Sequence, residues 1–211
     1  MRSVDVHQHL WPEAVLRVLE ARSTPPRARW GGDRWRIELA CEPAFDVDPD
    51  QHDPETRTDE LTVDRALVAL SGPVGLEGLP PRDALAAIAA WQEAARDLPD
   101  ELGWWAATPT ALAGDGEAEL AVQAITDGAA GVCLPADRLA TPASAQTATP
   151  LLAAVAEAGA PVFIHPGPAG GSAGEPEWWA PATRYVAQQQ AAWHVFNHVV
   201  RPELPGLRAV F

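Results

Sequence analysis

Three histidines stand where strand-like segments end, and their spacing suits a divalent metal ion. His7 and His9 belong to the segment Asp5–His9, and His165 ends the apolar run Pro161–His165. Side chains two residues apart on a strand point to the same face, so His7 and His9 can reach one ion, and Asp5 shares that face one step deeper. Three imidazoles suit zinc best. The sequence therefore predicts a metal site, with Zn²⁺ as the expected ion and His7, His9 and His165 as its ligands.

The alternative is that these histidines are core or surface residues satisfied by ordinary hydrogen bonds. A single histidine would usually have that role, but two at strand spacing beside a buried strand are costly without a partner. We therefore favour metal binding.

The other histidines are weaker candidates. His194 and His198 are four residues apart in a helical stretch, but the glutamate of a zinc-protease motif is missing between them. We expect them on a helix surface or in packing. His52 lies between Asp50 and Asp53, where a solvated loop position is expected.

Strand and helix patterns alternate along the chain, which predicts parallel βα units. The expected strands are Ser3–His7, Arg65–Leu70, Leu102–Thr108, Ala130–Leu134, Ala160–His165 and Leu207–Phe211. The expected helices are Pro12–Arg22, Pro81–Leu98, Glu117–Asp127, Leu151–Ala158 and Thr183–Val200.

One segment interrupts this alternation. Residues Ala28–Leu39 have alternating side chains around a Gly-Gly pair, which predicts an inserted β-hairpin. The acidic, proline-bearing stretch Pro43–Pro54 is expected to be an irregular loop, followed by a short helix over Glu55–Leu61.

Length and charge narrow the class of protein. With 211 residues, one domain over 1–211 is expected. The net charge of −14 argues against nucleic acid and anionic membranes as partners. Two cysteines, no signal-like start and no apolar run of about 18 residues favour a cytoplasmic protein without membrane spans. All 15 basic residues are arginine, which we interpret as a bias of a high-GC bacterial genome.

The segments Asp5–His9 and Ile164–Pro168 together resemble the amidohydrolase-related (amidohydrolase 2) group of the amidohydrolase superfamily, whose members include aminocarboxymuconate-semialdehyde decarboxylase. The resemblance extends to the order of elements and to the inserted hairpin. It implies an α/β fold, a TIM-type (β/α)₈ barrel with the metal at the carboxyl ends of its strands. Such a barrel typically needs ~250 residues, so the chain resembles roughly its N-terminal two-thirds, ending after about six strands. The histidine of strand six and the aspartate of strand eight that the group uses in catalysis would lie beyond Phe211, so no catalytic residue is assigned.

For activity, the resemblance implies a metal-dependent hydrolase in which metal-activated water attacks a small organic acid, lactone or amide. Non-oxidative decarboxylation on the same scaffold is the alternative, and the motifs do not separate the two. A third interpretation is an incomplete barrel that needs a partner polypeptide or a second copy of itself. A homodimer is compatible with the sequence, but no residue establishes an interface.

Aromatic residues near the expected site are candidates for substrate binding. Trp11 follows His9 by two residues, and Trp178 lies in the loop after the fifth strand, so both could shape an apolar or aromatic pocket. Arg184 could hold a substrate carboxylate in a bidentate grip, although a surface position without this role is the favoured alternative for it. Neighbouring residues on a strand face opposite ways, so one of Trp104 and Trp105 should face the barrel interior and the other the helices.

Overall fold

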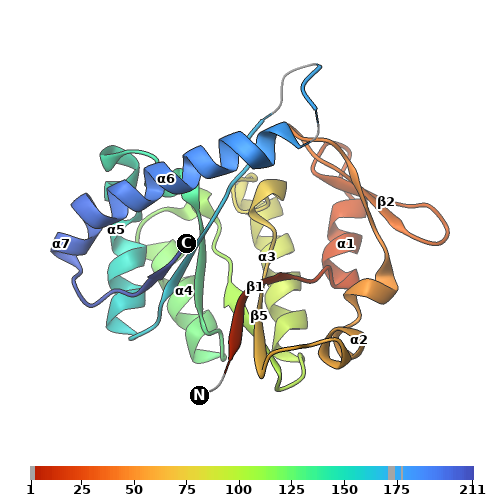
Figure 1. Ribbon diagram of the computed structural model, residues 1–211, viewed down its shortest axis with the longest axis horizontal. Helices are drawn as coiled ribbons and strands as arrows, with labels where there is room; N and C mark the ends of the chain where they lie inside the picture. The colour runs from red at the N-terminus through yellow and green to blue at the C-terminus, as the bar shows by residue number, and fades with distance from the viewer. Residues whose placement is uncertain (1–2, 171–173, 177) are drawn as a thin grey trace.

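A curled sheet of six parallel strands organises the molecule (Figure 1). The computed structural model describes residues 3–170, 174–176 and 178–211. Each strand pairs in parallel with the next one in the sheet. In spatial order the strands are β1 (Val4–His9), β5 (Arg65–Ala69), β6 (Leu102–Ala106), β7 (Gly131–Pro135), β8 (Val162–His165) and β9 (Ala209–Val210). The six predicted strands and their order are confirmed.

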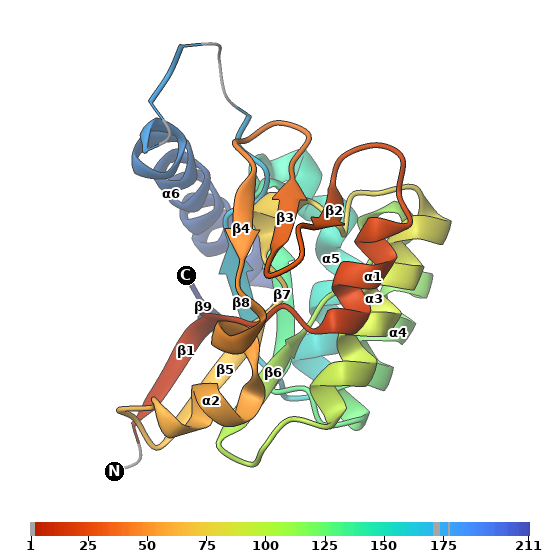
Figure 2. The same cartoon turned by 90° about the vertical axis from the view of Figure 1, so that its right-hand side faces the viewer.

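Helices connect consecutive strands and cover the outer face of the sheet (Figure 2). They are α1 (Glu13–Glu20), α3 (Pro81–Arg96), α4 (Asp115–Thr126) and α5 (Pro142–Glu157), while α6 (Val186–Val195) leads from β8 toward β9. This is the βα alternation of a TIM-type barrel that stays open, since β1 and β9 each pair on one side only among the described residues.

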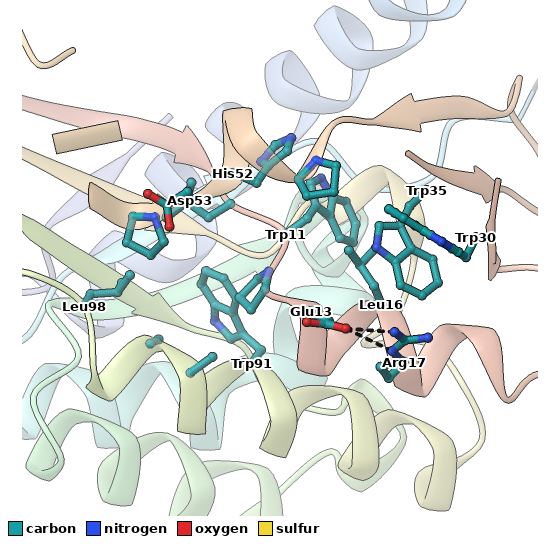
Figure 3. Close-up of a pocket in the computed structure, with 16 residues that line it drawn as sticks. Trp11, Glu13, Leu16, Arg17, Trp30, Trp35, His52, Asp53, Trp91 and Leu98 are labelled. Carbon is teal, nitrogen blue, oxygen red and sulfur yellow. Dashed lines mark hydrogen bonds and ion pairs between the residues drawn. The ribbon is translucent and has the colours of Figure 1, made fainter. Parts of the chain in front are cut away.

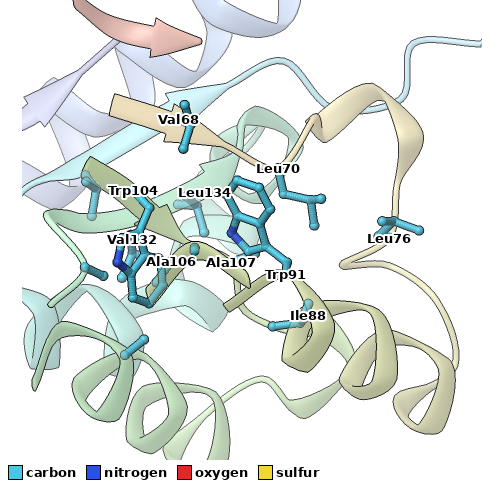
Figure 4. Packing of buried hydrophobic residues seen from close by; sticks show 14 of the residues in the cluster. Val68, Leu70, Leu76, Ile88, Trp91, Trp104, Ala106, Ala107, Val132 and Leu134 are labelled. Atoms are coloured by element: carbon cyan, nitrogen blue, oxygen red, sulfur yellow. The ribbon is translucent and has the colours of Figure 1, made fainter. Parts of the chain in front are cut away.

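The two faces of the sheet carry separate hydrophobic clusters. The larger one lies between sheet and helices and includes Trp104 and Trp91 (Figure 4). The smaller one lies on the opposite, inner face, where Trp105 and Phe163 pack with their ring centroids 5.3 Å apart. The prediction that Trp104 and Trp105 face opposite ways is confirmed, because adjacent strand residues alternate between faces.

The insertion after α1 is larger than the predicted hairpin. Strands β2 (Arg27–Trp30) and β3 (Trp35–Glu38) form the expected antiparallel pair, but β4 (Phe45–Val47) adds a third strand to it. The prediction of an irregular loop over Pro43–Pro54 is therefore wrong, because this range contains β4 and the 3₁₀ turn η1 (Pro49–His52). The predicted short helix is confirmed as α2 (Pro54–Asp59).

Three of the longer helices begin earlier than predicted, and the first of them is α4, which starts at Asp115 instead of Glu117. Helix α5 starts at Pro142 instead of Leu151, because Thr141 and Ser144 form a capping box and Pro150 is accommodated inside the helix. The last long helical stretch begins at Ala180 with π-type turns η5 (Ala180–Tyr185) and ends with π-type turns η6 (Phe196–Val200) and the short α7 (Arg201–Glu203). The remaining short turns are η2 (Gly72–Val74), η3 (Thr110–Leu112) and η4 (Ala136–Leu139). Among the described residues, none of the helices has the length and apolar character to cross a bilayer.

Candidate metal centre

The structure brings His7, His9 and His165 together at the carboxyl ends of β1 and β8. The Nε2 atom of His7 lies 3.1 Å from Nε2 of His9 and 2.9 Å from Nε2 of His165, and the third side of this triangle is 3.1 Å. Three Zn–N bonds of about 2.0–2.1 Å in tetrahedral geometry place the nitrogens roughly 3.3 Å apart. The triangle therefore has nearly the dimensions that one ion requires.

A β-bulge in β1 lies at the two candidate ligands of this strand, His7 and His9. Asp5 lies opposite Ala66 of β5, but Gln8 lies opposite Val68, so β1 carries one residue more than its partner over this interval. The Asp5 carboxylate accepts hydrogen bonds from the backbone N–H of His7 (3.0 Å) and the side-chain amide of Gln8 (2.9 Å). These bonds lower the pKa of Asp5. Asp5 thus stabilises the bulge rather than joining the histidine triangle.

Backbone carbonyls orient two of the rings. The Nδ1 atom of His9 lies 2.9 Å from the carbonyl oxygen of Ala69, and Nδ1 of His165 lies 2.8 Å from that of Pro166. A carbonyl only accepts, so Nδ1 carries the proton in both rings and Nε2 presents a lone pair to the centre. Lone pairs about 3 Å apart repel unless a cation or a proton lies between them.

Burial keeps these rings neutral. His165 is buried and His9 is partly buried, and desolvation lowers the pKa of all three histidines, that of His165 to about 3. The inner cluster contributes to this burial, because the Phe163 ring centroid lies 5.1 Å from that of His7 and 5.5 Å from that of His165. Neutral imidazole is the form that binds metal, so the residues present fit a divalent cation at neutral pH.

The predicted substrate residues do not gather at this triangle. Trp11 is buried in the wall of a separate cavity, described below. Trp178 is 62% exposed and packs on Trp179. Arg184 donates to the Gly170 carbonyl at 2.5 Å and to Glu175 at 2.8 Å, so its guanidinium is already engaged within the loop after β8. The roles of these three residues in substrate binding stay predictions.

The remaining histidines divide between surface and interior. His194 and His198 are exposed on one face of the last helical stretch with their rings stacked 6.2 Å apart, in agreement with the surface role expected for them. His52, expected in a solvated loop, is instead partly buried, and its Nδ1 atom has no hydrogen-bond partner among the described residues. Burial lowers the pKa of His52, and nearby Arg57 lowers it further.

Sequence inspection missed one buried acid. Glu77, in the loop between β5 and α3, is 1% exposed, and neither carboxylate oxygen has a hydrogen-bond partner within the described part of the chain. Desolvation raises the pKa of Glu77 to about 8, and the nearby Asp137 adds to that effect. The carboxyl of Glu77 is therefore largely protonated at neutral pH. A glutamate in a Gly- and Pro-rich loop gives no sign of such burial.

The fold and the histidine triangle define a class: an open βα barrel with a candidate metal site at the carboxyl ends of its strands. Solved structures share this fold. IDCase from Metarhizium anisopliae superposes with a TM-score of 0.75 at 19% identity, over 98% of this chain and 63% of that one. A protein named amidohydrolase II gives a TM-score of 0.69 at 17% identity, over 99% and 65%.

A third similar structure contains a metal. The 5-carboxyvanillate decarboxylase from Novosphingobium aromaticivorans, complexed with manganese and 4-hydroxy-3-methoxy-5-nitrobenzoic acid, has a TM-score of 0.64 at 14% identity, over 99% of this chain and 64% of that one. No family model and no curated protein matches the sequence. This chain thus spans about two thirds of the length of the similar structures. The predicted resemblance to amidohydrolase-related proteins is confirmed at the level of the fold.

Proposed function

We propose that this chain carries the metal-binding part of a non-oxidative decarboxylase that acts on a small aromatic or unsaturated carboxylic acid. The observation that supports it is the convergence of three imidazole Nε2 atoms, 2.9–3.1 Å from one another, at the carboxyl ends of β1 and β8. The fold likeness to a decarboxylase with bound manganese and an aromatic acid favours this reaction over the hydrolysis that the sequence first suggested.

A bound divalent ion would supply Lewis-acid stabilisation of negative charge on the substrate and a lowered pKa for a bound water. We propose His7, His9 and His165 as its ligands, with zinc and manganese as the two candidate ions. The chain's own residues hold this site in place: Ala69 and Pro166 fix the imidazole tautomers through their carbonyls. Phe163 packs against the rings of His7 and His165 on the inner face of the sheet.

Hydrolysis is the second candidate function. The same three nitrogens could serve it, because hydrolysis and decarboxylation on a histidine-held ion make the same demand on these ligands. The two functions differ in their products, and this difference decides the experiment.

The test uses the native polypeptide, loaded with Zn²⁺ or Mn²⁺ and incubated with a panel of carboxyl-labelled aromatic acids. We expect release of labelled carbon dioxide with at least one acid, and loss of that release in His165→Ala. The matched control His198→Ala changes an exposed histidine outside the triangle and should leave release unchanged. Turnover of esters, lactones or amides without gas release would contradict the proposed decarboxylation and support hydrolysis.

A further inference from the structure

A separate cavity of about 470 Å³ lies on the outer side of β1, between α1, α3, η1 and the inserted sheet (Figure 3). Four tryptophans line it: Trp30, which is 44% exposed, and Trp11, Trp35 and Trp91, which are buried. None of the three histidines of the candidate metal centre is among the lining residues. Its volume falls within the range of about 300–1,000 Å³ that small-molecule sites occupy.

One cation already lies on the wall of this cavity. The guanidinium carbon of Arg17 is 4.8 Å from the ring centroid of Trp35, a distance at which the ring quadrupole attracts positive charge. Arg17 is held there by Glu13 at 2.9 Å and Glu20 at 2.8 Å, as the dashed lines to Glu13 in Figure 3 indicate. Among the described residues, no arginine stacks on Trp11, Trp30 or Trp91.

The charged residues that line the cavity carry a net negative charge, which favours a cationic ligand. Glu13 and Asp53 bring two carboxylates, and Arg17 brings one positive charge. Glu13 uses only Oε1 to accept from Arg17, and Asp53 uses only Oδ2 to accept from the backbone of Thr56. Their other oxygens accept no hydrogen bond in the described part of the chain and belong to exposed side chains, so they are free to face a bound cation. The whole protein carries a net charge of −14. A carboxylate ligand would meet repulsion here.

We propose that this cavity binds an organic cation, a quaternary or alkyl ammonium group that lies against the exposed ring of Trp30, with Glu13 and Asp53 as counter-charges. Aromatic faces and nearby carboxylates are the combination that recognises a weakly hydrated ammonium. A neutral apolar molecule would fill the same volume but would gain no electrostatic attraction from the two carboxylates. The site is independent of the decarboxylation proposed for the metal centre.

Calorimetric titration of the intact protein with choline tests this, compared with its neutral isostere 3,3-dimethylbutan-1-ol. The two probes have nearly the same shape and differ in charge. We expect choline to bind at least about tenfold more tightly, in keeping with a desolvated cation–π contact. Equal binding of the two probes, tighter binding of benzoate, or no heat of binding with choline up to about 10 mM would overturn the proposal.

Matched tryptophan variants locate the site. Trp30→Ala removes a wall residue that is 44% exposed, so its loss is tolerable for folding, and it should weaken choline binding about fivefold or more. Trp193→Ala removes a tryptophan of similar exposure, 49%, on α6 and should leave binding unchanged. Glu13→Gln should weaken choline but not the isostere. Equal effects of Trp30→Ala and Trp193→Ala would contradict the assigned place.

Discussion

Three imidazole Nε2 atoms face one another at the candidate metal centre, and those of His9 and His165 present their lone pairs to each other. Without a cation or a shared proton, their repulsion opposes the geometry that β1 and β8 impose. The free energy of metal binding offsets that repulsion, so metal content should respond sharply to the loss of one ring.

His7→Ala is expected to lower bound metal from about one ion per chain to a small fraction, because two nitrogens cannot complete the site. Elemental analysis after dialysis against a trace of Zn²⁺ or Mn²⁺ measures this. The control His194→Ala removes an exposed histidine of α6 and should retain the metal. Metal content that is unchanged in His7→Ala would rule out the proposed ligand set.

At the scale of single residues, the sequence predicted those features of the site that depend on the spacing of nearby residues. His7 and His9 could be assigned because a strand sets their directions, and His165 because it ends an apolar strand. The bulge in β1 could not be predicted, since it depends on pairing with β5. Glu77 and His52 were missed because their burial comes from packing between segments distant in sequence, which residue type alone does not reveal.

Among the structural elements, the turn after β5, η2 (Gly72–Val74), packs against the end of β8 beside His165. A Cβ atom added at Gly72 would lie 2.4 Å from the carbonyl oxygen of Pro166 and 2.9 Å from Nδ1 of His165. These two atoms form the hydrogen bond that orients the His165 ring. Only glycine allows this turn to pack against the end of β8.

Gly72→Ala should therefore displace the Pro166 carbonyl, weaken metal binding about 10- to 100-fold, and destabilise the fold by about 1–3 kcal/mol. Gly116→Ala is the matched control, because nothing lies within 4 Å of a Cβ atom there. It should be neutral or slightly stabilising in α4. Metal titration and thermal melts measure both variants, and equal behaviour of the two would contradict this account of the turn.

Helix and strand boundaries were predicted less well than their order, for identifiable reasons. The helix predicted from Leu151 begins at Pro142, although Pro150 inside it lacks the N–H that continues a helix. The capping box at Thr141 and Ser144 sets the true start of α5, and the helix accommodates Pro150. Strand β4 has three residues, too few for an alternating pattern, and forms only by pairing with β3.

At the scale of the whole molecule, the alternation of βα units was enough to predict the parallel sheet, because short right-handed crossovers leave few other arrangements. The sequence did not reveal which ionisable side chain would be buried at a cost in folding free energy. Glu77 is such a place: its carboxyl is enclosed, and the described residues offer it no hydrogen bond. Its protonation therefore contributes to the pH dependence of global stability.

The sign of this dependence follows from the raised pKa. Between the ordinary glutamate value near 4.5 and the folded value of about 8, the folded state binds a proton that the unfolded state has lost. The stability from Glu77 is thus complete below pH 4.5 and is lost as the pH rises toward 8. Glu77→Gln, a neutral mimic, should raise the free energy of unfolding at pH 8 by a few (~2–4) kcal/mol and flatten its decline with pH.

Urea unfolding at several pH values between 5 and 8.5 would measure this effect. Glu93→Gln, a change at an exposed glutamate of α3, is the control and should leave the pH profile as it is. A Glu77→Gln protein whose stability falls with pH as steeply as the unaltered protein would show that Glu77 is ionised in the folded state.

The inserted sheet and the loop after β8 are connected through one side chain. Glu42, between β3 and β4, accepts a hydrogen bond from the backbone N–H of Ala169 at 2.9 Å and another from the hydroxyl of Tyr185. This carboxylate joins the insertion to the two ends of a loop that begins just after His165. Grafting the insertion from a related barrel onto this one would therefore have to keep an acceptor at position 42, since this carboxylate connects two segments distant in sequence.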